Sequence, residues 1–376
     1  MKRAMSQQAI HVNKGVTGMK IGMLTSGGDC QSLNAAMRGV AKTLYNNSKD
    51  VEIYGFLDGY RGMISKNYKL MKEDDFSGIL TEGGTILGTS RTPFKYINEP
   101  DEEGRDKIAS MIKTYKELKL DCLVMLGGNG SHKTAALLSE KGLNVVTLPK
   151  TIDNDIEGTE MSFGFQSAID VATRTIDEIH TTAASHSRVF IVEIMGHKTG
   201  WLTLHAGIAG GADIILIPEI PYNVDEIVKT IKMREKQGKK FKIIAMAEGA
   251  VSQEDIRLSK KELKEKKKTY VFPSVAYQLS DELQKIAGQE VRVTIPGHVQ
   301  RGGIPSAGDR TLATRIGVMA AQLILKKEYG NMVCIKDGRF SQVPLEEVAG
   351  KTKMVDTDNE LVRQAELLGI SLGRKA

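Results

Sequence analysis

Short apolar runs alternate with longer amphipathic segments along most of this chain. Runs that predict strands cover 19–26, 51–57, 121–128, 143–150, 188–196, 213–220, 242–249, 291–297 and 332–338. Several are apolar on both faces, as strands of a buried parallel sheet are. Helical spacing of apolar residues predicts helices over 33–46, 131–142, 167–186, 224–237 and 310–327. This alternation predicts an α/β protein with two doubly wound domains and mostly parallel sheets.

Length and composition narrow the class of protein. A chain of 376 residues is longer than a single hydrophobic core usually organises, so two domains are expected. With 41% hydrophobic and 26% charged residues it is typical of a soluble globular protein. A net charge of +6 suits an enzyme for anionic metabolites, or a basic surface without function, and is far from that of a dedicated nucleic-acid binder. We expect the lysine-rich stretch 257–270 to be a solvated loop or short helix, with no nucleic-acid partner.

The ends and the cysteines bear on cellular location. Residues 1–18 are basic without an apolar core, so we expect a disordered tail and no secretory signal. No run approaches the ~18 apolar residues of a membrane helix, so no membrane partner is expected. Cys30, Cys122 and Cys334 have no metal-ligand spacing and are odd in number. These features together favour a reducing cytoplasm.

Glycine-rich turns follow two of the predicted strands. Gly27 and Gly28 follow the first strand, and GGNGS (127–131) follows the third, before a helix expected to start near Ser131. Glycine lets the backbone approach a phosphate closely, and the N–H groups at a helix start attract anions. Neither turn is a Walker A motif. Ligands of such folds bind at the carboxyl ends of the strands, where these turns lie.

A carboxylate pair follows the fourth strand, in PKTIDND (149–155). Asp153 and Asp155 lie two residues apart and face one side of an extended segment. One can act as a base while the other holds a metal or orients a partner, although paired aspartates also occur in plain turns. Lys150 beside them can neutralise phosphoryl charge. Arginines at loop–strand junctions can bind phosphate or be ordinary surface residues: Arg91, Arg188, Arg292 and Arg301.

These segments together resemble the phosphofructokinase family over about residues 19–340. The matching motifs, in order, are TSGGD (25–29), LNAAMRG (33–39), GFLDGYRG (55–62), GGTILGTSR (83–91), GGNGS (127–131), PKTIDND (149–155), SHSR (185–188), VEIMGHKTG (192–200), AGIAGGAD (206–213), PE (218–219), AEG (247–249) and GHVQRGG (297–303). TIDND followed by MG and GHVQRGG is a highly specific combination. The resemblance implies transfer of a phosphoryl group from ATP to the 1-hydroxyl of fructose 6-phosphate, the glycolytic reaction that gives fructose 1,6-bisphosphate.

The resemblance also implies separate roles for two domains and for individual residues. The phosphoryl-donor domain would comprise 19–164 plus 300–350, and the sugar-phosphate domain 165–299 plus 351–376. Asp153 would be the base, Asp155 would support it and help place the metal, Thr151 would contact the transferring group, and Arg91 would bridge donor and substrate. The expected ATP-binding residues are Gly28, Arg91, Gly128, Gly130 and Ser131. The expected substrate-binding residues are Thr151, Asp153, Arg188, Met195, Gly196, His197, Glu248, Arg292, His298 and Arg301.

Subunits and metal follow from the same resemblance. Arg188 and Arg292 would reach the sugar phosphate of a neighbouring subunit, which implies a homo-oligomer, with a tetramer expected. The implied cofactor is Mg²⁺, held by Asn129 and Asp155. The family usually carries aspartate where this chain has Asn129, so one ligand charge is missing here.

Two positions bear on the phosphoryl donor. Pyrophosphate-using relatives generally carry aspartate where this chain has Gly130, together with a lysine at the position of Lys150. Because an aspartate would crowd and repel the α-phosphate of ATP, Gly130 favours ATP. A pyrophosphate-dependent enzyme is the nearest alternative. A second alternative is a catalytically weakened regulatory protein. Asn129 is compatible with this hypothesis, whereas the intact Asp153 and Asp155 argue against it.

Overall fold

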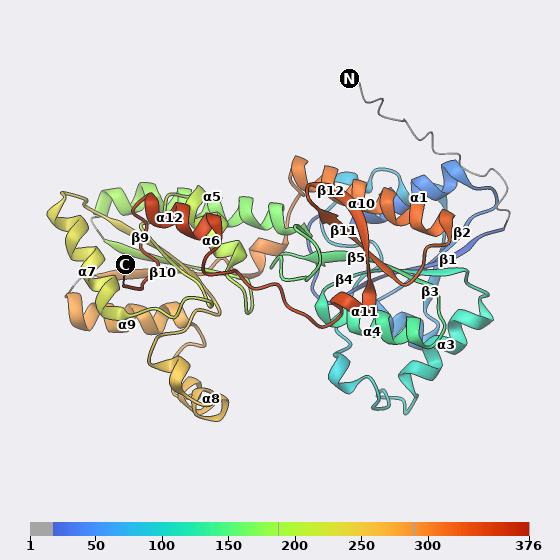
Figure 1. Cartoon of the computed structure of the whole chain (residues 1–376), viewed down its shortest axis with the longest axis horizontal. Coiled ribbons are helices and arrows are strands. Elements are labelled where there is room, and N and C mark those ends of the chain that lie inside the picture. The colour runs from blue at the N-terminus through green and yellow to red at the C-terminus, as the bar shows by residue number, and fades with distance from the viewer. Residues whose placement is uncertain (1–17, 187, 289, 376) are drawn as a thin grey trace, which may run out of the picture.

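The computed structural model describes residues 18–186, 188–288 and 290–375, which form two lobes, each built around its own sheet (Figure 1). Both sheets are mainly parallel and are covered by helices, which confirms the predicted α/β class. The expected disordered tail, apart from Gly18, lies outside the described residues.

The large lobe contains an eight-stranded sheet of order β12-β11-β5-β4-β1-β2-β3, with β6 paired to β5. Its central pairs are parallel, whereas β3 and β12 run antiparallel to β2 and β11. Neither of these two strands was predicted. The strands are β1 (Lys20–Ser26), β2 (Glu52–Phe56), β3 (Tyr68–Met71), β4 (Cys122–Gly127), β5 (Val145–Thr151), β6 (Phe163–Gly164), β11 (Asn331–Lys336) and β12 (Arg339–Pro344).

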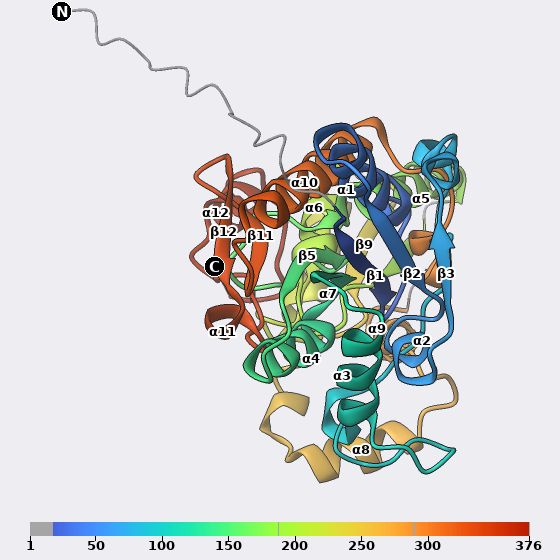
Figure 2. The same cartoon turned by 90° about the vertical axis from the view of Figure 1, so that its right-hand side faces the viewer.

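Helices α1 (Leu33–Asn47) and α10 (Ala307–Lys326) cover one face of this sheet, and α3 (Lys107–Glu117) and α4 (Asn129–Glu140) cover the other (Figures 1 and 2). The first two helices approach very closely. A Cβ on Gly39 would lie 2.5 Å from the Thr314 carbonyl oxygen, and one on Gly317 would lie 2.3 Å from that of Ala36. Only glycine at both positions allows this approach, so α10 packs directly on α1.

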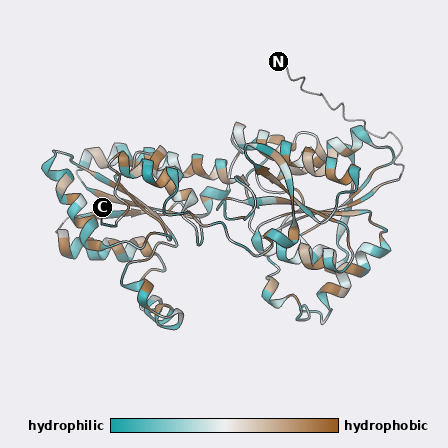
Figure 3. Ribbon diagram, in the orientation of Figure 1, coloured by the Kyte–Doolittle hydropathy of each residue, from teal (hydrophilic) through white to brown (hydrophobic). Residues whose placement is uncertain are grey.

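The small lobe contains a parallel sheet of order β10-β7-β9-β8. Helices α5, α6 and α12 pack on one face and α7 and α9 on the other, and apolar colour gathers along the sheets of both lobes (Figure 3). The elements are α5 (Phe165–His186), β7 (Val189–Ile194), α6 (Trp201–Ala209), β8 (Ile214–Leu216), α7 (Val224–Lys236), β9 (Lys242–Ala247), α9 (Val275–Ala287), β10 (Val291–Thr294) and α12 (Glu360–Leu367).

The chain passes between the lobes three times. It leaves the large lobe after β6, returns through α10, and completes the large sheet with β11 and β12. After α11 (Leu345–Val348) it crosses again to α12 (Figure 1). Each lobe is therefore assembled from segments far apart in sequence.

Several boundaries differ from the sequence predictions. Helix α4 begins at Asn129, not near Ser131, so Asn129 and Gly130 lie in its first turn. The basic stretch contains a short helix, α8 (Lys260–Lys268), which is one of the two conformations expected for it. The remaining short elements are α2 (Tyr60–Ser65), η1 (Glu73–Phe76), η2 (Ile79–Thr81), η3 (Phe94–Tyr96), η4 (Asp255–Arg257) and η5 (Gly297–Arg301). Across the described residues, no helix combines the length and apolar character needed to cross a membrane.

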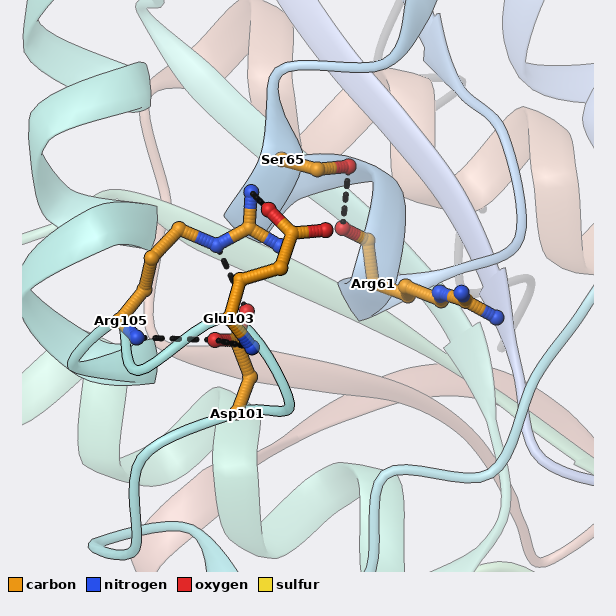
Figure 4. Close-up of polar contacts among 5 residues, drawn as sticks. All are labelled: Arg61, Ser65, Asp101, Glu103 and Arg105. Atoms are coloured by element: carbon orange, nitrogen blue, oxygen red, sulfur yellow. Dashed lines mark hydrogen bonds and ion pairs between the residues drawn. The ribbon is translucent and has the colours of Figure 1, made fainter.

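A turn between η3 and α3 is held by charged side chains (Figure 4). Arg105 pairs with Asp101 through its Nε (2.7 Å) and with Glu103 through a terminal nitrogen (2.9 Å). The Asp101 carboxylate also accepts the backbone N–H groups of Glu103 and Arg105. The turn is thus closed on itself, beside α2, where Ser65 donates to the carbonyl of Arg61.

Candidate active site

The carboxyl ends of strands from both lobes border one cleft of about 720 Å³. The strands β1, β4 and β5 supply its wall on the large lobe, and the turns after β7 and β9 supply the facing wall. The structure brings most of the predicted site residues together here. They are Gly28, Arg91, Gly128, Asn129, Gly130, Ser131, Lys150, Thr151, Asp153, Asp155, Met195, His197, Glu248 and Arg301.

The first turn of α4 presents unpaired backbone donors to the cleft. The N–H groups of Ser131 and His132 donate to the Gly128 carbonyl, whereas those of Asn129 and Gly130 meet no acceptor within the described part of the chain. The positive end of a helix with free N–H groups binds anions. A Cβ on Gly130 would meet open space, so this position borders the cleft without packing. The arrangement suits a phosphate.

Ser131 is held in place by its own hydrogen bonds. Its hydroxyl donates to the Ser26 hydroxyl (2.9 Å), and its carbonyl accepts from the hydroxyl of Tyr60 (3.0 Å). The side chain is buried, and it therefore joins α4 to the end of β1. The Ser131 hydroxyl oxygen still has acceptor capacity and a position on the cleft wall.

The first glycine turn is fixed by Lys150. Gly27 adopts φ +85°, which favours glycine, and its N–H donates to the Ser90 carbonyl (3.1 Å). The buried Lys150 ammonium donates to the Gly28 carbonyl, and burial lowers the pKa of this lysine. Lys150 thus joins the turn after β1 to the end of β5 and places positive charge under the cleft floor.

The carboxylate pair lies just beyond β5. The Asp153 backbone N–H donates to the Thr151 hydroxyl (3.0 Å), and the Thr199 hydroxyl donates to the Asp153 carbonyl (3.2 Å). The buried Asp153 Oδ1 has no hydrogen-bond partner among the described residues. Burial, and secondly the charge of Asp155, raise the pKa of Asp153 to about 6. A carboxylate of this kind is suited to accepting a proton near neutral pH.

The small-lobe wall is organised by Glu248. Its Oε1 accepts the backbone N–H groups of Gly196 (3.2 Å) and His197 (2.7 Å). The Met195 N–H donates to Gln300 Oε1 (3.3 Å), and Arg301 donates to the carbonyl of Asp29, which follows β1 (2.9 Å). Gly196 does not line the cleft, but its N–H donates to Glu248, which does.

Three predicted residues lie elsewhere. Arg188 and Arg292 meet at Glu290, on the β7–β10 side of the small sheet, and neither borders the cleft. The Arg188 Nε to Glu290 Oε2 distance is 2.5 Å. His298 lies in η5 with Arg301, yet only Arg301 reaches the cleft wall. A single chain therefore does not bring these three side chains to the carboxylates.

The cleft also contains residues that sequence reasoning missed. Lys198 lies inside the motif VEIMGHKTG and Lys133 lies two residues after GGNGS, and their position in or beside glycine turns was the signal available. Gly350 and Thr352 carry no such signal. Positive charge exceeds negative charge along the wall: Arg91, Lys133, Lys150, Lys198 and Arg301 against Asp153, Asp155 and Glu248. Such a cleft attracts anionic ligands.

Asn129 is engaged by the segment that contains Gly350. Its Oδ1 accepts the Gly350 N–H (2.9 Å), and its Nδ2 donates to the Lys351 carbonyl (2.5 Å) and approaches the Thr352 hydroxyl (3.3 Å). The predicted metal ligand is therefore already hydrogen-bonded through both amide atoms. By contrast, no hydrogen bond or ion pair reaches the carboxylate of Asp155 within the described residues.

Comparison with known proteins identifies the family. Residues 20–324 match the family model described as Phosphofructokinase. The chain is 52% identical over 355 residues to the ATP-dependent 6-phosphofructokinase of Spirochaeta thermophila, covering 94% of this chain and 97% of the relative. It is 44% identical over 356 residues to ATP-dependent 6-phosphofructokinase 3 of Bacteroides thetaiotaomicron, covering 94% and 100%.

A solved structure agrees with this relationship. Phosphofructokinase from Saccharomyces cerevisiae superposes with a TM-score of 0.73 at 33% identity, over 88% of this chain and 45% of that longer chain. The family match over residues 20–324 contains every residue of the cleft wall except Gly350 and Thr352. This chain belongs to the phosphofructokinase family.

Proposed function

We propose that this protein transfers the γ-phosphoryl group of ATP to the 1-hydroxyl of fructose 6-phosphate, giving fructose 1,6-bisphosphate in glycolysis. The observation that carries the proposal is the position of Asp153. Asp153 lines a cleft that has the free N–H groups of α4 on one side and Glu248 and Arg301 on the other, and one of its carboxylate oxygens is buried without a partner among the described residues. The similarity to ATP-dependent 6-phosphofructokinases supports the same reaction.

In this proposal each lobe binds one substrate. The large lobe, 19–164 plus 300–350, binds the donor phosphates through the α4 N–H groups, Gly28, Ser131 and Arg91. The small lobe, 165–299 plus 351–376, binds the sugar phosphate with Met195, His197 and Glu248 of the facing wall, and Gly196 supports this wall through its bond to Glu248. Arg301, from the segment 300–350, reaches the same wall, and His298, which lies off the wall, belongs to the proposed sugar-phosphate site. Asp153 takes the proton of the attacking hydroxyl, and Thr151 and Arg91 steady the transferring group. Such catalysis is mostly positioning and charge neutralisation.

The proposed cofactor is Mg²⁺, and the donor atoms present fit it. Mg²⁺ is usually bound through one or two carboxylates and the substrate phosphates, so a full protein cage is not required. Among the residues described, no three His, Cys, Asp or Glu side chains form such a cage. Asp155 offers a carboxylate without protein partners at the cleft, and we assign it as the ligand. The metal would neutralise phosphate charge in the transition state.

Steady-state kinetics with alternative donors test the proposal. We expect turnover of fructose 6-phosphate with ATP and little with pyrophosphate, because Gly130 leaves open space beside the helix start. Turnover only with pyrophosphate would favour the alternative donor. Tight binding of both substrates without turnover would favour a regulatory protein instead.

Asp155 should contribute to the pH dependence of the reaction, because its charge adds to the effect of burial on the pKa of Asp153. The groups that act on Asp153 are Asp155 and Glu248, which raise its pKa, and Arg301 and Lys150, which lower it. Since Asp153 must be ionised to accept a proton, kcat/KM of the wild type should fall as pH drops through about 6. Removing a like charge lowers a carboxyl pKa, so Asp155→Asn should shift this limb to lower pH. The measurement is kcat/KM of Asp155→Asn from pH 4.5 to 8. If its acidic limb stays at the pH of the wild type, the assignment of this limb to Asp153 is contradicted.

We further propose that the protein is a homo-oligomer, with a tetramer as the expected form. We also propose that it is located in the cytoplasm. The two arginines paired at Glu290 lie away from the chain's own cleft, which supports their use by a neighbouring subunit. Arg188→Ala and Arg292→Ala should each raise KM for the sugar phosphate, since a charge-assisted hydrogen bond contributes about 1.5–3 kcal/mol.

Mixing tests whether these arginines act across an interface. Verified hybrids of Arg188→Ala with Asp153→Asn chains should contain some sites with both groups intact, and activity should partly return. Hybrids that stay as inactive as their parents would show that both groups serve one chain.

A further inference from the structure

The segment 350–355, here called the strap, crosses from α11 to α12 along the cleft (Figure 1). At its start it is bound by Asn129 of the large lobe. The Gly350 N–H donates to Asn129 Oδ1, and the Lys351 carbonyl accepts from Asn129 Nδ2. A Cβ on Gly350 would lie 2.3 Å from the side chain of Lys133, so the strap also packs tightly on α4.

The middle of the strap is bonded to the catalytic loop. Thr352 forms an antiparallel bridge with Ile156, and the Lys353 N–H donates to the Asp155 carbonyl (2.9 Å). The Lys353 ammonium donates to the carbonyls of Thr159 (2.8 Å) and Glu160 (2.9 Å). The backbone that carries Asp155 is therefore paired with the strap as one strand pairs with another.

The end of the strap is bound to the small lobe. Trp201 Nε1, in the first turn of α6, donates to the Lys353 carbonyl (2.9 Å). Glu219 Oε1 accepts both the Val355 N–H (2.9 Å) and the Gly200 N–H (3.0 Å). The strap thus has hydrogen bonds to the first turn of α4, to the catalytic loop and to the small lobe.

We propose that Asn129 is a positioning residue, which acts through the strap to fix the backbone of Asp155 against the donor-binding turn of α4. The inference rests on the proposed phosphoryl transfer for its kinetic consequence, and on the hydrogen bonds alone for its structural one. The strap lies outside residues 20–324, which match the family model, so nothing in that match assigns it a part in the site.

The chemistry of the amide supports this reading. Asn129 uses one atom as acceptor and the other as donor, and the strap offers a backbone N–H and a carbonyl in the matching order. An aspartate could accept from Gly350 but could not donate to Lys351, and its second oxygen would face a carbonyl oxygen. Asparagine therefore fits the strap, whereas a carboxylate would fit a metal ion better.

The variant Asn129→Asp separates these two roles. If Asn129 is a positioning residue, the kcat of Asn129→Asp should be about tenfold or more below that of the wild type. A tenfold loss corresponds to an increase of about 1.4 kcal/mol in the activation free energy. The KM for fructose 6-phosphate should change less, and the Mg²⁺ concentration for half-maximal activity should not decrease. A lower Mg²⁺ midpoint with kcat retained would identify position 129 as a metal ligand and overturn the proposal.

Amide hydrogen exchange measures the stability of the strap independently of enzyme activity. In Asn129→Ala, amide exchange at Gly350 and at Lys353 should both become faster, because release of the first anchor loosens the bond to Asp155. The matched control is Asn144→Ala, which removes an amide-to-carbonyl bond to Asp121 (2.9 Å) away from the cleft. It should leave both amides unchanged. Faster exchange confined to Gly350 would show that Asn129 does not act through the strap.

A second anchor provides a coupling test. Trp201→Phe keeps a ring but removes the donor to the Lys353 carbonyl. If both residues act through the strap, the loss of kcat in the double variant with Asn129→Ala should be clearly smaller than the product of the single losses. Multiplicative losses would contradict the proposal. If wild-type protein shows no turnover with ATP, the proposed function fails, and hydrogen exchange alone still decides whether Asn129 holds the strap.

Discussion

Asp153→Asn is expected to lower kcat by about 10²-fold or more, the usual contribution of a general base. The change keeps the shape of the side chain and removes its negative charge and its capacity to accept a proton. The KM values for both substrates should change much less, because the change removes a proton acceptor and leaves the size of the cleft unchanged. The measurement is kcat under saturating substrates, with chemistry shown to limit the rate.

The same variant should not lose stability. The Asp153 carboxylate is held partly buried with an unpartnered oxygen, and its pKa is raised to about 6. A raised pKa means that the folded state disfavours the ionised form present at pH 7, so a neutral amide relieves that cost. We expect a Tm at or above that of the wild type. A variant that keeps more than half its turnover would show that Asp153 is not the base.

Gly130→Asp should make ATP use collapse, by about 10²-fold or more in kcat/KM, while pyrophosphate use survives or appears. The new side chain would enter the open space that Gly130 leaves at the cleft wall. Two like charges about 4 Å apart repel by about 4 kcal/mol at the effective dielectric of a protein surface. The experiment is a comparison of both donors at matched Mg²⁺ concentrations.

Gly130→Ala separates volume from charge. Its methyl group enters the same open space, and alanine is favoured over glycine within a helix such as α4. The loss with ATP should therefore be far smaller than that of Gly130→Asp. Full ATP activity in Gly130→Asp would show that this position is not beside the donor phosphates.

The parts of the site that sequence predicts are those whose residues follow buried strands. GGNGS and PKTIDND each end an apolar run, and parallel strands bring their carboxyl ends to one edge of a sheet. This is why Gly128, Ser131 and Asp153 meet in one cleft although each motif alone is ambiguous. The alternation of strands and helices likewise predicted the α/β class.

The parts that sequence could not predict depend on contacts between distant segments. The start of α4 at Asn129 is set by the cleft-facing turn and not by a capping side chain, since Gly128 has none to offer. The strap carries no motif, because it is held through its backbone amides and carbonyls, which any sequence possesses. The edge strand β3 has three exposed residues of four, so its apolar signal is weak.

The close contact of α1 with α10 bears on the order in which the chain folds. α1 is complete by Asn47, but α10 begins only at Ala307, and β5 gains its neighbour β11 only at Asn331. During synthesis the large lobe must therefore wait for most of the chain, with the apolar flank of α1 uncovered. Strands β7 to β10 of the small lobe all arise between Val189 and Thr294, so their sheet can pair first. Folding from the middle of the chain outward is the order that this connectivity favours.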